Sequence, residues 1–164
     1  MVSAFLSSVI LVSVHAGFQA GIDLRCFDSF FYPSVRIDGE IAYRFGKLRL
    51  TVPIRYSSSS DYELDMLESG LLVSLYPFDD CGFFCAVSLL RAGYMWGLEA
   101  PTDELVFFSE AVIGWTFSFS HFFLEPRFCM LDAFNTEEEV LEALEEAVPQ
   151  YSSFRLSLMT GISF

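Results

Sequence analysis

The chain has 164 residues, of which 53% are hydrophobic and 17% aromatic, and its formal net charge is −13. This composition excludes intrinsic disorder, and beyond the first residues no stretch is apolar for the roughly 18 residues that a membrane-spanning helix needs. A chain that is apolar on average, but only over short stretches, is typical of alternating β-strands that face lipid.

Residues 1–16 contain no Asp, Glu, Lys or Arg, and their apolar segment ends in Val14-His15-Ala16, a small-x-small export cleavage pattern. The pattern predicts a secretory signal peptide over 1–16, cut after Ala16, and a β-barrel domain over 17–164. The alternative is a buried first strand, because the apolar segment is too short to cross a bilayer as a helix.

From Gly17 onward, apolar and polar residues alternate with a period of two, which predicts β-strands. The expected strands cover residues 17–26, 35–45, 47–56, 67–76, 83–96, 110–119, 122–130 and 154–164. The connections alternate between short (45–47, 77–82, 119–122) and long (27–34, 57–66, 99–106, 135–150). Because this alternation is strict, all long loops lie at one end. We expect an all-β, eight-stranded antiparallel up-and-down transmembrane barrel with one short helix in the last long loop.

All nine Lys and Arg residues lie on the polar face of these strands, and eight of them are Arg, whose planar guanidinium suits enclosed ion pairs. Six acids share that face, so we expect a charge network in the lumen. Its members are Asp23, Arg25, Arg36, Asp38, Glu40, Arg44, Arg49, Arg55, Glu68, Arg91, Glu110, Glu125, Arg127 and Arg155. Since eight strands enclose little more than their own side chains, no general diffusion pore is expected.

Aromatic residues gather at both ends of the strands, as in the girdles of membrane barrels. The loop-end group is Phe27, Tyr32, Tyr56, Tyr94, Trp96, Phe107, Phe134 and Tyr151. The turn-end group is Tyr43, Phe45, Phe78, Phe83, Phe119, Phe122 and Phe164. Together with the charge network, the girdles favour a lipid-facing barrel over the alternative, a soluble exported sandwich or lipocalin-like barrel with its apolar face inward.

The chain closes with FRLSLMTGISF, in which hydrophobic residues, among them Leu158 and Ile162, alternate up to a terminal Phe164. This segment looks like the C-terminal signal of bacterial outer-membrane barrels, which is read by the barrel assembly machinery. Over its whole mature length the chain resembles the small OmpA/OmpX/OmpW-type barrels. The resemblance implies a monomer surrounded by outer-membrane lipid, with its loops extracellular.

Two prolines, Pro53 and Pro126, fall inside predicted strands, where a closed barrel has no edge to accommodate a missing N–H. Each therefore requires a bulge or a locally interrupted ladder.

The last long loop contains the clearest helix signal. Thr136 and Glu139 form a capping box, and Pro149 follows the end. The apolar stripe of this helix consists of Val140, Leu141, Leu144 and Val148. We expect the stripe to pack over the barrel mouth as a lid; the alternative is that it docks a partner.

Residues with possible chemistry favour no enzyme. The four cysteines Cys26, Cys81, Cys85 and Cys129 are spaced poorly for disulfides or zinc, so free thiols are expected. His121 lies in a polar turn without a group to orient it, and the acidic loop 57–65 lacks the pattern of a calcium loop. No catalytic residue, cofactor or metal is expected.

Fourteen acids lie in or beside the long loops, which contain no Lys or Arg. Such a negative field excludes nucleic acid and favours cations or basic surface proteins as partners. We expect a structural or surface-interaction, adhesin-like role. The alternative is an OmpW-like conduit for small hydrophobic molecules, lined by Leu72, Val87, Leu89, Val112 and Met159.

Overall fold

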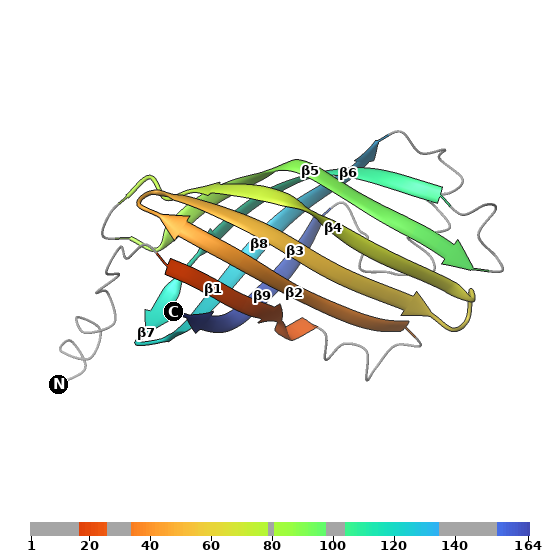
Figure 1. Cartoon of the computed structure of the whole chain (residues 1–164), viewed down its shortest axis with the longest axis horizontal. Helices are drawn as coiled ribbons and strands as arrows, with labels where there is room; N and C mark the ends of the chain where they lie inside the picture. The colour runs from red at the N-terminus through yellow and green to blue at the C-terminus, as the bar shows by residue number, and fades with distance from the viewer. Residues whose placement is uncertain (1–16, 26–33, 79–80, 98–103, 135–153) are drawn as a thin grey trace.

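The computed structural model describes residues 17–25, 34–78, 81–97, 104–134 and 154–164. Its strands are β1 (Gly17–Asp23), β2 (Ser34–Phe45), β3 (Leu48–Ser59), β4 (Leu64–Leu75), β5 (Phe83–Gly97), β6 (Glu104–Trp115), β7 (Phe117–Phe119), β8 (Phe122–Phe134) and β9 (Phe154–Ser163). All pairs of neighbours are antiparallel, in the order β6-β5-β4-β3-β2-β1-β9-β8-β7, and a further β6–β8 pairing closes the sheet (Figure 1).

The sheet is an eight-stranded barrel, because β6 and β7 are two segments of one wall strand. Both pair with β8, and only Thr116 separates them. Its amide donates to the Gly82 carbonyl at 2.8 Å, which continues the β5–β6 register by one residue, and the register with β8 is the same before and after it. The predicted all-β, eight-stranded antiparallel barrel is thus confirmed.

Two of the predicted connections are shorter than expected. β3 continues to Ser59 and β4 begins at Leu64, so the long loop expected over 57–66 is a tight turn. The serine run forms strand because Ser57 and Ser59 face inward and are buried. Likewise β6 begins at Glu104, within the loop expected over 99–106.

The expected signal peptide at 1–16 and the expected lid helix with Val140, Leu141, Leu144 and Val148 lie outside the described residues. The described part of the chain contains no α-helix. Nor does it contain a helix long and apolar enough to cross a membrane.

The described start and the end of the chain meet at the turn end of the barrel. The Phe164 amide donates to the Phe18 carbonyl at 2.9 Å, and Gly46, with φ of 60°, makes the β2–β3 turn at the same end. Figure 1 shows these turns together at one end, and the described ends of the strands that lead into the longer connections at the other.

Both strand prolines lie at interruptions of the hydrogen-bond ladder, as expected. Pro53 pairs with Glu40 of β2, but the β3–β4 register omits it. Pro126 pairs with Leu158 of β9, and on its other side the β8 ladder breaks between β6 and β7. Each proline therefore pairs with one neighbouring strand, and the ladder on its other side is interrupted, so no ladder hydrogen bond is required of it there.

The outer face of the barrel is apolar and rimmed by aromatic rings. At the turn end Tyr43, Phe45, Phe78, Phe119, Phe122 and Phe164 are all exposed. At the loop end Tyr94 is exposed and stacks on Trp96, with their ring centroids 5.8 Å apart. Between the rims the exposed side chains are mainly aliphatic, for example Ile41, Ile54, Leu89, Leu90 and Ile113.

Candidate functional site: the charged lumen

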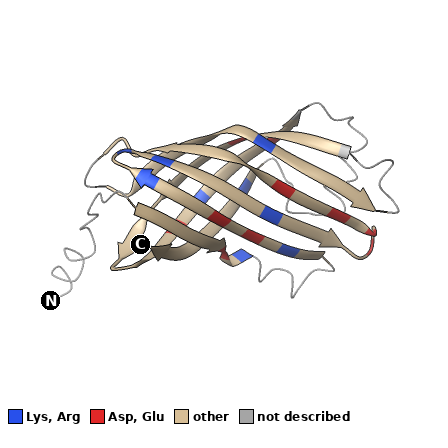
Figure 2. Ribbon diagram, viewed as in Figure 1, with Lys and Arg blue, Asp and Glu red and all other residues tan. Residues whose placement is uncertain are grey.

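Charged residues are distributed along most of the barrel strands (Figure 2), and the strand alternation turns most of their side chains inward, where they are buried. The buried ones are Asp23, Arg36, Asp38, Glu40, Arg44, Arg49, Arg55, Glu68, Arg91, Glu110, Glu125 and Arg155, and Arg127 has a side chain that is only 9% exposed. Ionised groups are buried at a high free-energy cost unless each is paired and hydrogen-bonded. The arrangement of the pairs therefore decides whether this lumen is stable.

Eight of these side chains form one continuous series, which we call the loop-side ion-pair chain. It runs Asp23, Arg36, Asp38, Arg55, Glu68, Arg91, Glu110, Arg155, so acid and base alternate throughout. The Asp38 Oδ2 atom lies 2.7 Å from Arg36 Nη2 and 2.8 Å from Arg55 Nε. One carboxylate thus joins strands β2 and β3.

The second half of the loop-side ion-pair chain crosses four more wall strands. Glu68 Oε2 of β4 accepts from Arg91 of β5 at Nη2 (2.5 Å) and Nε (3.0 Å). Arg91 also donates to Glu110 of β6, whose other oxygen lies 2.6 Å from Arg155 Nη2 of β9. Because four acids meet four arginines, the chain carries no net charge.

The two ends of the loop-side ion-pair chain approach each other where β1 pairs with β9. Ser157, two residues after Arg155 on β9, donates through Oγ to Asp23 Oδ2 of β1 at 2.7 Å. The Leu158 amide donates to the other oxygen of Asp23 at 3.3 Å. Side chains thus continue the β1–β9 contact where the backbone ladder ends at Asp23 and Met159.

A second group, the turn-side cluster, consists of Glu40, Arg127, Glu125 and Arg49. Arg127 donates to both oxygens of Glu40, at 2.7 and 2.6 Å, and also to Glu125 Oε2 at 2.5 Å. Glu125 Oε1 lies 2.5 Å from Arg49 Nη1 and accepts from the Thr116 hydroxyl at 2.8 Å. Thr116 therefore stabilises the cluster at the residue where β6 gives way to β7.

Aromatic rings inside the barrel support several of the guanidinium groups. Arg44 Cζ lies 3.7 Å from the Tyr76 ring centroid, and Arg49 Cζ lies 4.8 Å from that of Phe84. The sequence prediction missed Phe84 as a lumenal residue because residues 83–96 alternate poorly, whereas Tyr76 shares the parity of the inward-facing Glu68 and Ser74 in the predicted strand 67–76. The available signal was the parity of Ala86 and Phe84, which both face inward.

Apolar clusters lie inside on either side of the loop-side ion-pair chain. Leu64, Met66, Met95, Val106, Phe108 and Leu131 form one cluster, and Leu72, Tyr76, Phe84, Ala86, Val112 and Cys129 form the other. The lumen is therefore filled by side chains along the described strands, with bulky Arg36, Arg49 and Arg91 among the most buried.

Only part of the lining expected for a hydrophobic conduit faces inward. Leu72, Val112 and Met159 are buried, whereas Val87 and Leu89 are 53% and 65% exposed on the outer face. The cause is an irregularity in β5, whose register with β6 is interrupted between Val87 and Ala92 and reverses the parity of the strand.

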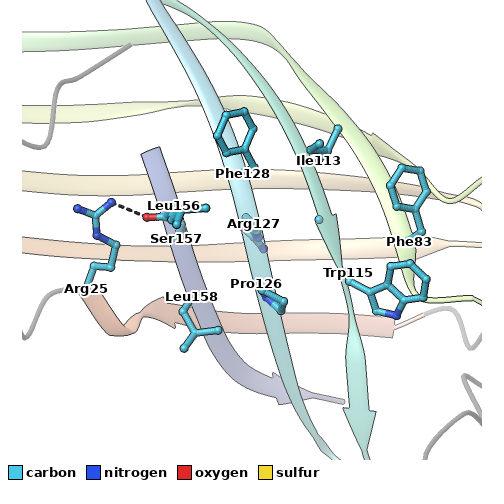
Figure 3. A pocket seen from close by; sticks show the side chains of 11 residues that line it. Arg25, Phe83, Ile113, Trp115, Pro126, Arg127, Phe128, Leu156, Ser157 and Leu158 are labelled. Carbon is cyan, nitrogen blue, oxygen red and sulfur yellow. Dashed lines mark hydrogen bonds between the residues drawn. The ribbon is translucent and has the colours of Figure 1, made fainter. Parts of the chain in front are cut away.

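Arg25 is the one predicted network residue that lies elsewhere. β1 ends two residues before it, and its guanidinium donates a hydrogen bond to the backbone carbonyl of Leu156 on β9 (Figure 3). The side chain is part exposed and lines a groove together with the outward-facing Leu156 and Phe128. This placement differs from the lumenal one predicted, because that prediction extended the first strand to residue 26.

The remaining candidates for chemistry are the cysteines, His121 and possible metal ligands. Cys81, Cys85 and Cys129 are free thiols, and Cys26 lies outside the described residues. His121 is exposed in the β7–β8 turn. Within the described ranges, no group of His, Cys, Asp and Glu is arranged to hold a metal ion.

The residues of the C-terminal signal occupy the outer face of β9 and the end of the chain. Ile162 is 38% exposed and Phe164 75% exposed, while Leu158 is half-buried. Ile162 pairs with Ala20 of β1 and with Phe122 of β8, so the signal lies where the last strand of the chain pairs with the first.

The arrangement as a whole turns charge inward and apolar surface outward, and it braces the wall strands through ion pairs. Comparison with protein-family models, with curated proteins and with solved structures finds no match to this chain.

Proposed function

We propose that this protein is a monomeric integral barrel of the bacterial outer membrane, of the small OmpA/OmpX/OmpW-like class, with extracellular loops and a lumen closed by its own side chains. One observation carries the proposal: alternating acids and arginines fill the lumen while the exposed outer face is apolar. Such a molecule is stable only where lipid covers its outer face. A soluble lipocalin-like barrel would have the opposite polarity.

Two features of the surface support the membrane assignment. The exposed tyrosines and phenylalanines at both ends match the interfacial girdles of membrane barrels, with Tyr94 at the loop end and Tyr43 at the turn end. The alternating hydrophobic residues that end at Phe164 match the segment read by the barrel assembly machinery, which we propose inserts the chain.

Membrane fractionation followed by heat-modifiable migration on gels tests this assignment. We expect the chain in the outer-membrane fraction and a folded band that shifts only after boiling. A soluble periplasmic protein without such a shift would contradict the proposal.

The closed lumen implies a structural or surface-interaction role rather than transport. Reconstituted in planar bilayers, the chain should give no steady openings, because the buried, ion-paired side chains of Arg55, Glu68 and Arg91 help to fill the lumen. Replacing both Arg55 and Arg91 with Ser should produce measurable conductance, while Lys47→Ser in the exposed turn should not. Steady openings of the unsubstituted chain that hydrophobic solutes block would instead support the conduit, for which inward-facing Leu72, Val112 and Met159 are the favourable observation.

The loop end is where we place the interaction surface. The described turn after β3 carries Asp61 and Glu63, and no Lys or Arg of the chain lies in the long connections. We expect the reconstituted barrel to bind a polycation such as polylysine, with binding that weakens as salt is added. Binding that salt leaves unchanged would contradict an electrostatic surface.

A further inference from the structure

A groove in the outer wall lies over β6 and is bounded by β5 and β8; we call it the β6 groove. It has a volume of about 520 Å³, within the usual range of small-molecule sites. It shares no lining residue with the groove beside Arg25. It lies on the face that the proposed function assigns to lipid.

A small side chain on β6 gives the groove its depth. One register row crosses the wall from Val87 of β5 through Ala111 of β6 and Met130 of β8 to Phe154 of β9. All four side chains are exposed on the outer face, and that of Ala111 is the smallest, so the wall is low between Val87 and Met130. This row forms the apolar half of the groove.

The next row toward the loop end is polar. Ser109 of β6 pairs with Asp132 of β8, and both are exposed on the outer face. Ser88 of β5 lines the same end, where the β5–β6 register is interrupted and its Oγ accepts the Glu110 N–H at 2.7 Å. Two serine hydroxyls and one carboxylate thus line the loop-side half of the groove.

The Asp132 carboxylate has no hydrogen bond or ion pair to another residue in the part of the chain that the structure describes. In contrast Asp65, which also faces outward near the loop end, accepts the Tyr56 hydroxyl at 2.6 Å. A carboxylate on a lipid-facing wall is costly unless a cation covers it. The lining of the β6 groove contains no Lys or Arg, so the chain itself supplies no cation there.

We propose that the β6 groove binds an aminolipid, by which we mean an amphiphile whose head group is a cationic ammonium group. The ammonium lies at Asp132 and Ser109, whose oxygens accept its N–H donors, and the alkyl chain lies over Ala111. The polar row is on the loop side of the apolar row, which is the order of head group and chain in the loop-side leaflet. A phosphate head group does not fit, because no cation of the groove would meet it. The inference rests on the proposed membrane location and adds a specific site to it.

Tryptophan quenching at the groove tests this inference. Phe154→Trp places a reporter on the groove wall of the full barrel, in which Trp96→Phe and Trp115→Phe remove the native tryptophans. The barrel is reconstituted in phosphatidylcholine bilayers with a small fraction of a single-chain amphiphile whose alkyl chain is brominated and quenches tryptophan on contact. Salt at about 0.5 M screens the general attraction of the negative loops for cations.

We expect the amphiphile with a primary ammonium head group to quench the Phe154→Trp reporter roughly threefold more strongly than one with the same chain and a phosphocholine head group. In this background Asp132→Asn, which keeps the shape of the side chain, should abolish the preference. Asp61→Asn, which removes an equal charge from the β3–β4 turn, should leave it intact. A barrel that keeps Trp115 and Phe154 and carries only Trp96→Phe should show no preference, because Trp115 lies at the turn end, outside the β6 groove.

Each other outcome has a distinct meaning. Equal quenching of the Phe154→Trp reporter by both amphiphiles would overturn the ammonium site while leaving the membrane barrel in place, since both chains then touch the wall. A preference that survives Asp132→Asn, that Asp61→Asn also removes, or that Trp115 shares would overturn the site as well. Quenching of neither reporter by either amphiphile would overturn the site and the proposed membrane location together. The two head groups are compared with Asp132 in place, so a misfolded Asp132→Asn variant does not remove the test.

Discussion

The Asp23 carboxylate of β1 accepts the backbone N–H of Leu158 on β9 at 3.3 Å, in the place where a neighbouring strand would supply a carbonyl. A side chain thus completes the barrel wall at its closure. The same carboxylate accepts the Ser157 hydroxyl at 2.7 Å and lies 3.8 Å from the Arg36 guanidinium. Asp23 therefore links the wall ladder to the loop-side ion-pair chain.

Replacing Asp23 with Ala should destabilise the barrel strongly, because it leaves Arg36 and the Leu158 amide without this partner. We expect a loss of about 3–5 kcal/mol in the free energy of unfolding, measured by urea titration in lipid vesicles with tryptophan fluorescence. Asp132→Ala, which removes an exposed acid on β8, is the matched control and should change it by less than about 0.5 kcal/mol. Equal effects of the two substitutions would show that the closure does not depend on Asp23.

Glu68 and Arg91 should behave as one energetic unit. The single variants Glu68→Gln and Arg91→Met each leave a buried charge without its main partner, so each should be strongly destabilising. The double variant should cost less than the sum, with a coupling energy of about 1–3 kcal/mol in a double-mutant cycle from the same urea titrations. Additive losses would indicate that the pair makes no specific contribution.

Gly161 of β9 permits the close approach of β1 and of the Phe123 ring. An added Cβ would lie 2.0 Å from the Ala20 carbonyl oxygen and 2.7 Å from that ring, so Gly161→Ala should cost about 1–3 kcal/mol. Gly39→Ala is the control, since the nearest atom to its Cβ would be 3.4 Å away. The temperature to which the sample must be heated before the compact gel band disappears should be lower for Gly161→Ala than for the unsubstituted chain and unchanged for Gly39→Ala. A comparable decrease for Gly39→Ala would contradict this account.

Tyr76 stabilises the turn end of the lumen in two ways that substitutions can separate. Its hydroxyl lies 3.1 Å from Thr116 Oγ1, and its ring lies under Arg44. Tyr76→Phe should cost about 0.5–1.5 kcal/mol for the hydrogen bond. Tyr76→Leu should cost about 1–2 kcal/mol more, because the cation–π contact of a desolvated guanidinium is lost as well. Identical urea midpoints for the two variants would exclude a role for the ring.

The alternation of the sequence alone determined the number of wall strands and the inward face of most charged residues. It did so because successive side chains of any strand point to opposite faces, which is a local property of the backbone. Asp38 and Glu40 on β2, and Arg55 on β3, could therefore be placed from their parity alone.

Only the tertiary structure decided which of these charges meet and where the alternation fails. Arg127 pairs with Glu40 and Arg155 with Glu110 because closure of the sheet sets the register between strands that are distant in sequence. The bulge in β5 turned Val87 outward, and the early end of β1 placed Arg25 on the outer wall beside β9. Such choices depend on the fit of all eight wall strands at once, which no single segment of sequence contains.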